Sequence, residues 1–138
     1  MVNIKYKSMN KSFDVIVIGA GHSGCEAALA SSRLGCNTAV VVMDASKIGW
    51  MSCNPSIGGP AKGQIVGEID ALGGEMGKAA DATFLQFRVL NRSKGPAVHS
   101  YRTQNDKYDY AAYMNDALVN QSNLTIIEDM VTDLIIED

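Results

Sequence analysis

The spacing of three glycines near the N-terminus is the feature that most constrains how this chain folds. Gly19, Gly21 and Gly24 form a GxGxxG pattern in the stretch GAGHSG. The pattern directly follows an apolar run, FDVIVI (13–18), and opens an alanine-rich stretch, HSGCEAALASSRL (22–34). A strand, a glycine turn and a helix in this order form the context in which the pattern binds a dinucleotide. The sequence therefore predicts an α/β protein with a Rossmann-like parallel sheet.

Each glycine of the pattern has a separate role. The first allows a tight turn, the second lets the backbone approach a pyrophosphate, and the third lets the helix pack closely on the strand. The free N–H groups and the dipole of the helix start attract the diphosphate. NAD and FAD share this pattern. We expect the cofactor to lie against the whole turn, which comprises Gly19, Ala20, Gly21, His22, Ser23 and Gly24. For the histidine, a purely structural role remains open.

An acidic residue about 20 positions after the pattern usually binds the ribose. Asp44 lies 20 residues after Gly24 and follows a second apolar run, TAVVVM (38–43). If the strand ends before Met43, that residue takes the ribose position and no acid is present there. The sequence leaves both arrangements open.

The rest of the chain continues the mixed pattern. Helices are predicted over 62–72, 75–82 and 107–120, the last with Asp106 as its N-cap, and a strand is predicted over 84–90. Short β-branched runs follow at 124–128 and 131–136. The first of these helices has one apolar face, and three methionines are expected in the core. The residues concerned are Ile65, Ile69 and Leu72 for the face, and Met76, Met114 and Met130 for the core.

A glycine-rich stretch, residues 48–63, contains Cys53, four glycines and two prolines. This composition predicts no regular element. The stretch follows the second strand, so it lies toward the carboxyl edge of the sheet, where ligands bind. Cys53 is either a catalytic thiol or a small apolar filler, because cysteine is commonly buried. A reactive thiolate there would require a nearby cation, such as Lys62, or a helix N-terminus.

Charge and composition limit the class of protein. The chain has 138 residues, 46% of them hydrophobic, and a formal net charge of -3. This suits a globular protein, and no apolar run approaches the roughly 20 residues of a membrane span. Three cysteines without a CxxC spacing argue against disulfides and a metal site and favour the cytoplasm, with Cys25 and Cys36 as packing residues.

One segment, residues 86–107, is basic although the whole chain is acidic. It contains five cations and one acid, namely Arg88, Arg92, Lys94, Arg102 and Lys107 against Asp106. Such a segment binds a polyanion, forms an ordinary solvated face, or lies against the cofactor and orders it.

Four stretches, in order and spacing, resemble the MnmG/GidA family. They are GAGHSGCEAALA, MSCNPSIGGPAKG, EIDALGGEMGKAAD and QFRVLNRSKGPAV, and the resemblance extends from about Phe13 to the C-terminus. It implies that FAD binds at the glycine pattern, that the backbone of Val131 contacts the adenine, and that Cys53 takes part in the chemistry.

The resemblance also implies a function. Members of this family are FAD-dependent enzymes that modify tRNA together with a GTPase partner, MnmE. They add an aminomethyl or carboxymethylaminomethyl group to C5 of the wobble uridine. Methylenetetrahydrofolate supplies the carbon, and NADH is the reductant, bound outside the region that this chain represents. They are generally homodimers, and no membrane association is expected.

Family members are several-fold longer than this chain. We therefore expect residues 1–12 to be a flexible tail and residues 13–138 to be the N-terminal portion of an FAD-binding Rossmann-like domain, inactive by itself. Two alternatives remain: a noncatalytic truncated flavin-domain fragment, and an FAD- or NAD-dependent oxidoreductase acting on a small molecule. The basic segment favours the tRNA-modifying enzyme, because a small-molecule pocket does not need five cations within 22 residues.

Overall fold

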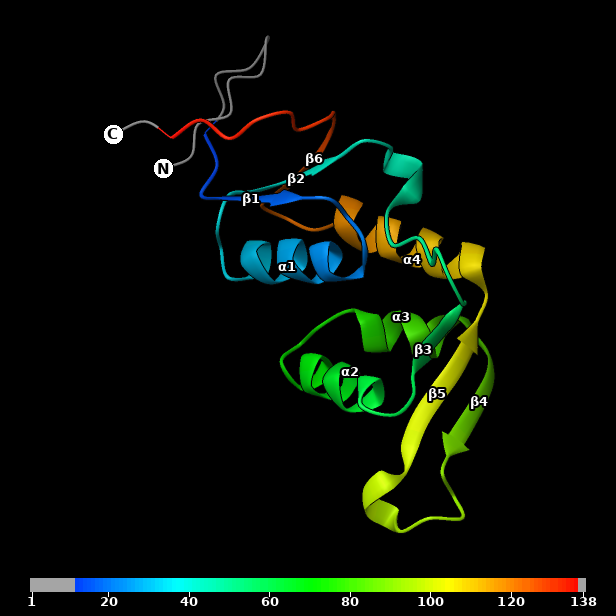
Figure 1. The fold of residues 1–138 in the computed structure, drawn as a ribbon. Coiled ribbons are helices and arrows are strands. Elements are labelled where there is room, and N and C mark those ends of the chain that lie inside the picture. Colours follow the sequence, from blue (N-terminus) through cyan, green and yellow to red (C-terminus); the bar gives the residue numbers. More distant parts are fainter. Residues whose placement is uncertain (1–11, 137–138) are drawn as a thin grey trace. The chain divides into compact units, whose positions relative to one another are not determined.

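The computed structural model describes residues 12–136, which divide into two compact units (Figure 1). The first unit contains the residues up to Ile48 and those from Asp116 onward, and the second contains Gly49–Asn115. The predicted tail lies, apart from Ser12, outside the described residues. None of the helices within 12–136 is long and apolar enough to cross a membrane. The boundaries predicted for the flavin domain stay a prediction.

A parallel sheet forms the centre of the first unit. Its strands are β1 (Val15–Ile18), β2 (Thr38–Val42) and β6 (Leu124–Glu128), in the order β1-β2-β6. All five residues of β2 are buried, as expected for a central parallel strand with a continuous apolar sequence. The predicted α/β class and parallel sheet are confirmed. The first strand begins two residues later than predicted, and the second ends one residue earlier.

Helix α1 (His22–Arg33) packs along one face of this sheet (Figure 1). Its buried residues recur at the spacing of one helical face, namely Cys25, Ala28, Leu29 and Ser32. The buried Ser32 hydroxyl donates a hydrogen bond of 2.8 Å to the Ala28 carbonyl, so burying it leaves no unmatched polar group. The helix ends at Arg33, and Leu34 is its C-cap. Gly35 follows with a φ of +91°, the conformation in which glycine commonly terminates a helix.

The second unit contains an antiparallel sheet and two helices. The strands are β3 (Ser56–Gly58), β4 (Phe84–Leu90) and β5 (Ser100–Asn105), in the order β3-β5-β4. Helix α2 (Lys62–Ala71) packs against β3 and β5, and α3 (Met76–Thr83) packs against β5. The two predicted helices and the strand over 84–90 are confirmed.

Two strands of this sheet correct the prediction from sequence. The stretch 48–63 is not wholly irregular, because β3 lies within it and α2 begins at Lys62. Strand β5 was not predicted, since its sequence, SYRTQN, is polar. Both strands form through pairing with each other, and this pairing joins residues far apart in the chain. Two short 3₁₀ helices, η1 (Ala45–Lys47) and η2 (Pro96–Val98), complete the connections, together with helix α4 (Lys107–Val119), whose last residues belong to the first unit.

A buried asparagine fixes the end of β5. The Asn105 amide nitrogen donates to the Ala80 carbonyl at 2.8 Å and to the Thr83 hydroxyl at 3.0 Å. Its amide oxygen accepts from the Thr103 hydroxyl at 2.7 Å, and its backbone N–H donates to the Pro55 carbonyl at 2.7 Å. One side chain therefore ties β5 to α3, and its peptide ties the same strand to the loop that carries Cys53.

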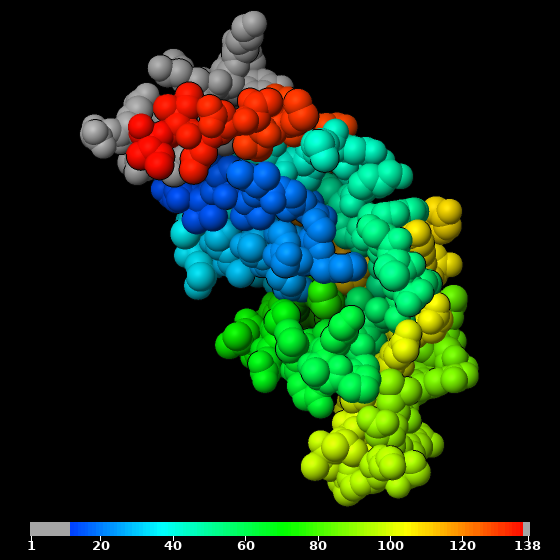
Figure 2. Space-filling model, viewed as in Figure 1, coloured from blue at the N-terminus to red at the C-terminus, as the bar shows by residue number. Residues whose placement is uncertain are grey.

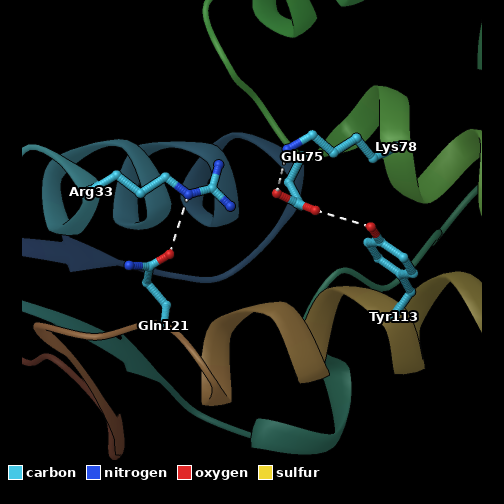
Figure 3. A network of polar contacts seen from close by, with 5 residues as sticks. All are labelled: Arg33, Glu75, Lys78, Tyr113 and Gln121. Carbon is cyan, nitrogen blue, oxygen red and sulfur yellow. Dashed lines mark hydrogen bonds and ion pairs between the residues drawn. The ribbon is translucent and has the colours of Figure 1, made fainter.

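Polar contacts also link elements within each unit (Figure 3). In the second unit, the buried Glu75 carboxylate accepts a hydrogen bond from the Tyr113 hydroxyl at 3.0 Å and lies 3.4 Å from the Lys78 ammonium. These contacts connect the start of α3 to α4. In the first unit, Arg33 Nε donates to Gln121 Oε1 at 3.2 Å, which connects the end of α1 to the segment after α4.

Three apolar predictions have mixed outcomes. Met114 is buried with 1% exposure, as predicted, whereas Met130 is 62% exposed, so its assignment to the core is wrong. Ile65 on α2 and Leu72, the C-cap of this helix, are 54% and 90% exposed, because the part of the chain that the structure describes does not cover these two side chains. The run over 131–136 is exposed and forms no regular element.

We expect Leu29→Ala to lower the free energy of unfolding by about 2–5 kcal/mol, because the side chain is fully buried between α1 and the sheet and its removal leaves a cavity. Leu34→Ala is the matched control on the same helix end. Leu34 is 84% exposed, so its truncation should change stability by no more than about 0.5 kcal/mol. Thermal unfolding of both variants measures the difference; equal melting temperatures would contradict this packing.

Candidate functional site

The turn between β1 and α1 has the geometry that the glycine pattern predicts. Gly19 has a φ of +88°, a conformation that favours glycine, and its N–H donates to the Val41 carbonyl at 2.8 Å. A Cβ atom on Gly24 would overlap the Gly19 carbonyl oxygen and would lie 3.7 Å from Val17 Cγ1. The first and third glycines therefore have the predicted roles of tight turn and close helix–strand packing.

Gly21 differs from its two neighbours in the pattern. Its backbone is extended, with φ −70° and ψ −173°, and a Cβ atom built there would meet nothing within 4 Å. It is the N-cap of α1, and no side chain caps the helix in its place. The first turn also contains no acidic residue. The space before this turn is therefore open, and the uncapped helix start suits an anion such as a diphosphate.

Two neighbours of the glycines shape the turn without adding charge. Ala20 is buried, and its carbonyl accepts a hydrogen bond from Cys25 Sγ at 3.3 Å, which confirms Cys25 as a packing residue. His22 is half-buried, and this burial lowers its pKa. Its ring is therefore neutral near pH 7. Attraction for an anion at this turn comes from the helix start and not from an imidazolium.

Asp44 lies just beyond β2, which ends at Val42. Its carboxylate caps η1, because Oδ1 accepts from the Ser46 N–H at 2.9 Å and from the Ser46 hydroxyl at 2.6 Å. These hydrogen bonds hold the pKa of Asp44 below its usual value. The spacing of Asp44 and Ser46 is itself a local capping signal, from which this contact could be predicted. Binding of the ribose by Asp44 stays a prediction, and Met43 occupies the preceding exposed position.

Val131 lies three residues after the end of β6. The N–H of Asp129 donates to the Val42 carbonyl at 2.8 Å and so extends the pairing of β6 with β2. Gly19, Asp44 and Val131 therefore follow the carboxyl ends of three neighbouring parallel strands. This edge is where open α/β sheets bind their ligands. The residues predicted to bind the cofactor therefore follow one edge of the sheet of the first unit, and their contact with a cofactor stays a prediction.

Cys53 belongs to the second unit and is exposed. Within residues 12–136 it therefore fills no apolar core, and its role in the chemistry stays a prediction. The loop around it is fixed on both sides, because Met51 is buried with 2% exposure and the Ser56 N–H donates to the Asn54 carbonyl at 2.8 Å. The hydrogen bond from Asn105 to Pro55 holds the same turn against β5. This arrangement presents the thiol to solvent from an ordered turn.

The two ends of this loop are anchored in different ways. At its start, the Trp50 ring has the Lys107 ammonium 4.3 Å from its centroid and the Tyr108 ring at 5.5 Å, edge to face. At its end, Gly58 has a φ of +89°, and a Cβ atom there would overlap the Tyr101 carbonyl oxygen. The backbone of Gly58 therefore lies very close to β5. Lys107 lies over an aromatic ring and is not a freely projecting cation.

No cluster of three or more histidine, cysteine, aspartate or glutamate side chains within residues 12–136 could hold a metal ion.

The parallel strand–helix–strand unit with its glycine turn defines the chain as a Rossmann-like fold of the FAD-binding type. At the level of the fold alone, it is similar to a probable FAD-dependent monooxygenase, pqsL from Pseudomonas aeruginosa. The TM-score is 0.54 and the identity 15%, over 83% of this chain and 32% of that one.

The family is defined more narrowly by sequence. Residues 14–138 match the family described as Glucose inhibited division protein A, and the chain belongs to this family. It is 60% identical over 126 residues to the tRNA uridine 5-carboxymethylaminomethyl modification enzyme MnmG of Synechocystis. The aligned region covers 91% of this chain and 20% of that protein. A solved structure of Aquifex aeolicus GidA is similar with a TM-score of 0.89 and 57% identity, over 92% of this chain and 21% of that one. The chain thus spans about a fifth of the length of these relatives.

We expect Gly24→Ala to destabilise the protein by about 1–3 kcal/mol, because the added methyl group overlaps the backbone of Gly19 and the turn must shift. Gly21→Ala is the control within the same turn, since its methyl group meets open space and its backbone conformation is available to any residue. Melting temperatures of the two variants without cofactor test the difference. A Gly24→Ala variant as stable as the control would show that the turn is described wrongly.

Proposed function

We propose that this chain is the nucleotide-binding part of an FAD-dependent enzyme that modifies tRNA. The observation that carries the proposal is the open, uncapped turn at Gly21, at the edge of a parallel sheet, in a chain 60% identical to a protein named as a tRNA-modifying enzyme. The open space fits a pyrophosphate, and the neutral helix start supplies N–H groups for it. We assign the adenosine half of FAD to the first unit.

The remaining residues of this edge have assigned roles in the proposal. The backbone of Val131 contacts the adenine, and Asp44 or Met43 lies beside the ribose. Ser46 competes for the Asp44 carboxylate, so a ribose hydroxyl would share that group. Bound FAD would supply the capacity to accept and donate electrons in the modification reaction. The residues of this chain bind it and orient it.

The reaction that we propose takes place at C5 of the wobble uridine. With the GTPase MnmE, the full-length protein adds an aminomethyl or carboxymethylaminomethyl group there. Methylenetetrahydrofolate provides the carbon unit, and NADH, bound outside this chain, is the reductant. We further propose that the protein acts as a cytoplasmic homodimer. Because the chain spans a fifth of its relatives, we expect no catalysis from residues 1–138 by themselves.

Cys53 is the proposed catalytic residue. Its exposure on a fixed turn supports this role, because a reacting thiol must be accessible and correctly placed. Two roles are possible for the thiol. It attacks the uridine ring and so activates C5, or it donates and accepts a proton during transfer of the carbon unit. Lys62, the first residue of α2, is exposed and remains the candidate cation.

The alternative of a small-molecule oxidoreductase is less well supported. The second unit exposes several cations on an open sheet and its connecting turn, and a small substrate would not need them. The alternative of a noncatalytic truncated fragment depends on how far the coding sequence extends and not on the residues of the site. The gene sequence beyond Asp138 tests this alternative, because a flavoprotein sequence that continues there would exclude a truncated protein.

We expect Gly21→Val in the full-length protein to abolish flavin binding while the melting temperature without flavin stays unchanged. The valine side chain would occupy the open space assigned to the pyrophosphate. Gly67→Val is a matched control, because Gly67 lies on α2 and an added Cβ atom there also meets nothing within 4 Å. Flavin absorbance of the purified proteins is the measurement. A stoichiometric yellow Gly21→Val protein would place the cofactor elsewhere.

We expect Cys53→Ser to reduce modification of the wobble uridine by about 10²-fold or more, because serine keeps the shape of the side chain and is a far weaker nucleophile and acid near neutral pH. Flavin and tRNA binding should be retained. Cys36→Ser is the control for a cysteine substitution outside the loop. The measurement is modified uridine formed with MnmE present, and wild-type rates would remove Cys53 from the mechanism. A covalent adduct with 5-fluorouridine tRNA would favour attack on the ring.

A further inference from the structure

One face of the antiparallel sheet gathers side chains that donate hydrogen bonds. In the register of the sheet, Gln86 pairs with Gln104 and Arg88 pairs with Arg102. On the other side of β5, Ser56 pairs with Gln104. Because alternate residues of a strand point to the same face, these five side chains share one face of the sheet. We call this set, Ser56, Gln86, Arg88, Arg102 and Gln104, the donor face.

The donor face is the side of the sheet away from its helices. On the opposite face, Ile57 and Thr103 are paired across β3 and β5 and are 9% and 8% exposed. Helix α2 packs against both strands and α3 packs against β5, which accounts for this burial. By contrast, Gln86, Arg88, Arg102 and Gln104 are all exposed. Within residues 12–136, nothing covers the donor face.

Two like charges stand directly opposite each other on this face. Arg88 and Arg102 pair across neighbouring strands, an arrangement that destabilises a sheet unless a counter-charge is present. Arg102 donates to the Ser56 hydroxyl at 3.0 Å, but that group is neutral. Among residues 12–136, no carboxylate forms an ion pair with either guanidinium. The donor face contains no acidic residue, so within the described part of the chain the two positive charges have no counter-charge.

We propose that the donor face binds backbone phosphates of the tRNA. This inference rests on the function proposed above and identifies where the nucleic acid lies. Arg88 and Arg102 occupy paired positions on neighbouring strands, and each provides a planar guanidinium whose donors match phosphate oxygens. Gln86 and Gln104, the next pair along the two strands, add amide donors. An anion bound near both arginines also reduces the repulsion between them. Arg92 and Lys94 are exposed in the turn after β4 and add two cations beyond the end of this strand. The segment that contains them is yellow-green in Figure 2 and lies on the visible surface of the second unit.

A polynucleotide is the occupant that the observations favour over a small anion. The donor face is an open sheet surface that continues along β4 into a cationic turn, so it offers several contacts in a row. Phosphate contacts of this kind supply sequence-independent affinity and position the substrate. The pyrophosphate of FAD is assigned to the first unit, at the turn before α1.

The test uses the full-length protein with the single variants Arg88→Gln and Arg102→Gln. The probe is an unmodified tRNA transcript, titrated over a range of salt concentrations in a gel-shift assay. Each variant should weaken binding by about tenfold at moderate salt and should lower the slope of log affinity against log salt by about one. Arg33→Gln is the matched control, since it removes an exposed arginine from α1, outside the sheet, and should leave both values unchanged.

The melting temperature without RNA provides a second measurement. If Arg88 served only to stabilise the fold, its replacement would lower the melting temperature. Without RNA, Arg88→Gln should leave the melting temperature unchanged or raise it, because one of two opposed like charges is removed. A lowered melting temperature would overturn the proposal, because it would show that the guanidinium is paired with an acid elsewhere in the protein.

Two further results would also overturn it. If the wild-type protein binds tRNA and both variants bind equally well with the same salt dependence, the donor face does not contact RNA, although the proposed function stands. If the variants lose flavin and keep their tRNA affinity, the arginines serve the cofactor. Failure of the wild-type protein to bind tRNA would instead remove the proposed function itself.

Discussion

The first unit depends on the pairing of β2 along both of its edges. The strand is completely buried, so each of its backbone polar groups must find a partner within the protein. β1 supplies these partners on one side, and β6, which follows much later in the sequence, supplies them on the other. Since all three strands are parallel, their carboxyl ends lie at one edge. The glycine turn, Asp44 and Val131 come together there because of this pairing.

The elements predicted best from the sequence are those whose signals are local. The strand before Gly19, the helix after it and the buried β2 were each marked by composition, periodicity and glycine position. Strand β5 was missed because its residues are polar, and only pairing with two distant segments makes it a strand. Met130 and Leu72 were expected to be buried from their hydrophobicity. Burial also requires a partner surface, and the described residues do not provide one.

The candidate site shows the same contrast between features that follow from local sequence and features that depend on distant contacts. The distinct roles of Gly19 and Gly24 follow from the spacing of the pattern, and the backbone geometry agrees with them. The contact between Asp44 and Ser46 is also local and was open to prediction. The opposition of Arg88 and Arg102 was not, because the charge count reveals five cations but not the strand register that brings two together. The exposure of Cys53 likewise depends on how its loop is held by β5.

Asn105 gives the second unit a single rigid support for two different chemical groups. The arginine of β5 on the donor face lies three residues before it, and its own peptide N–H holds the turn that follows Cys53. The spacing between the arginine that we propose to bind phosphate and the thiol is therefore set by one short strand and one hydrogen bond. A nucleic acid bound to the sheet would therefore lie at a fixed position relative to Cys53, without closure of a mobile loop.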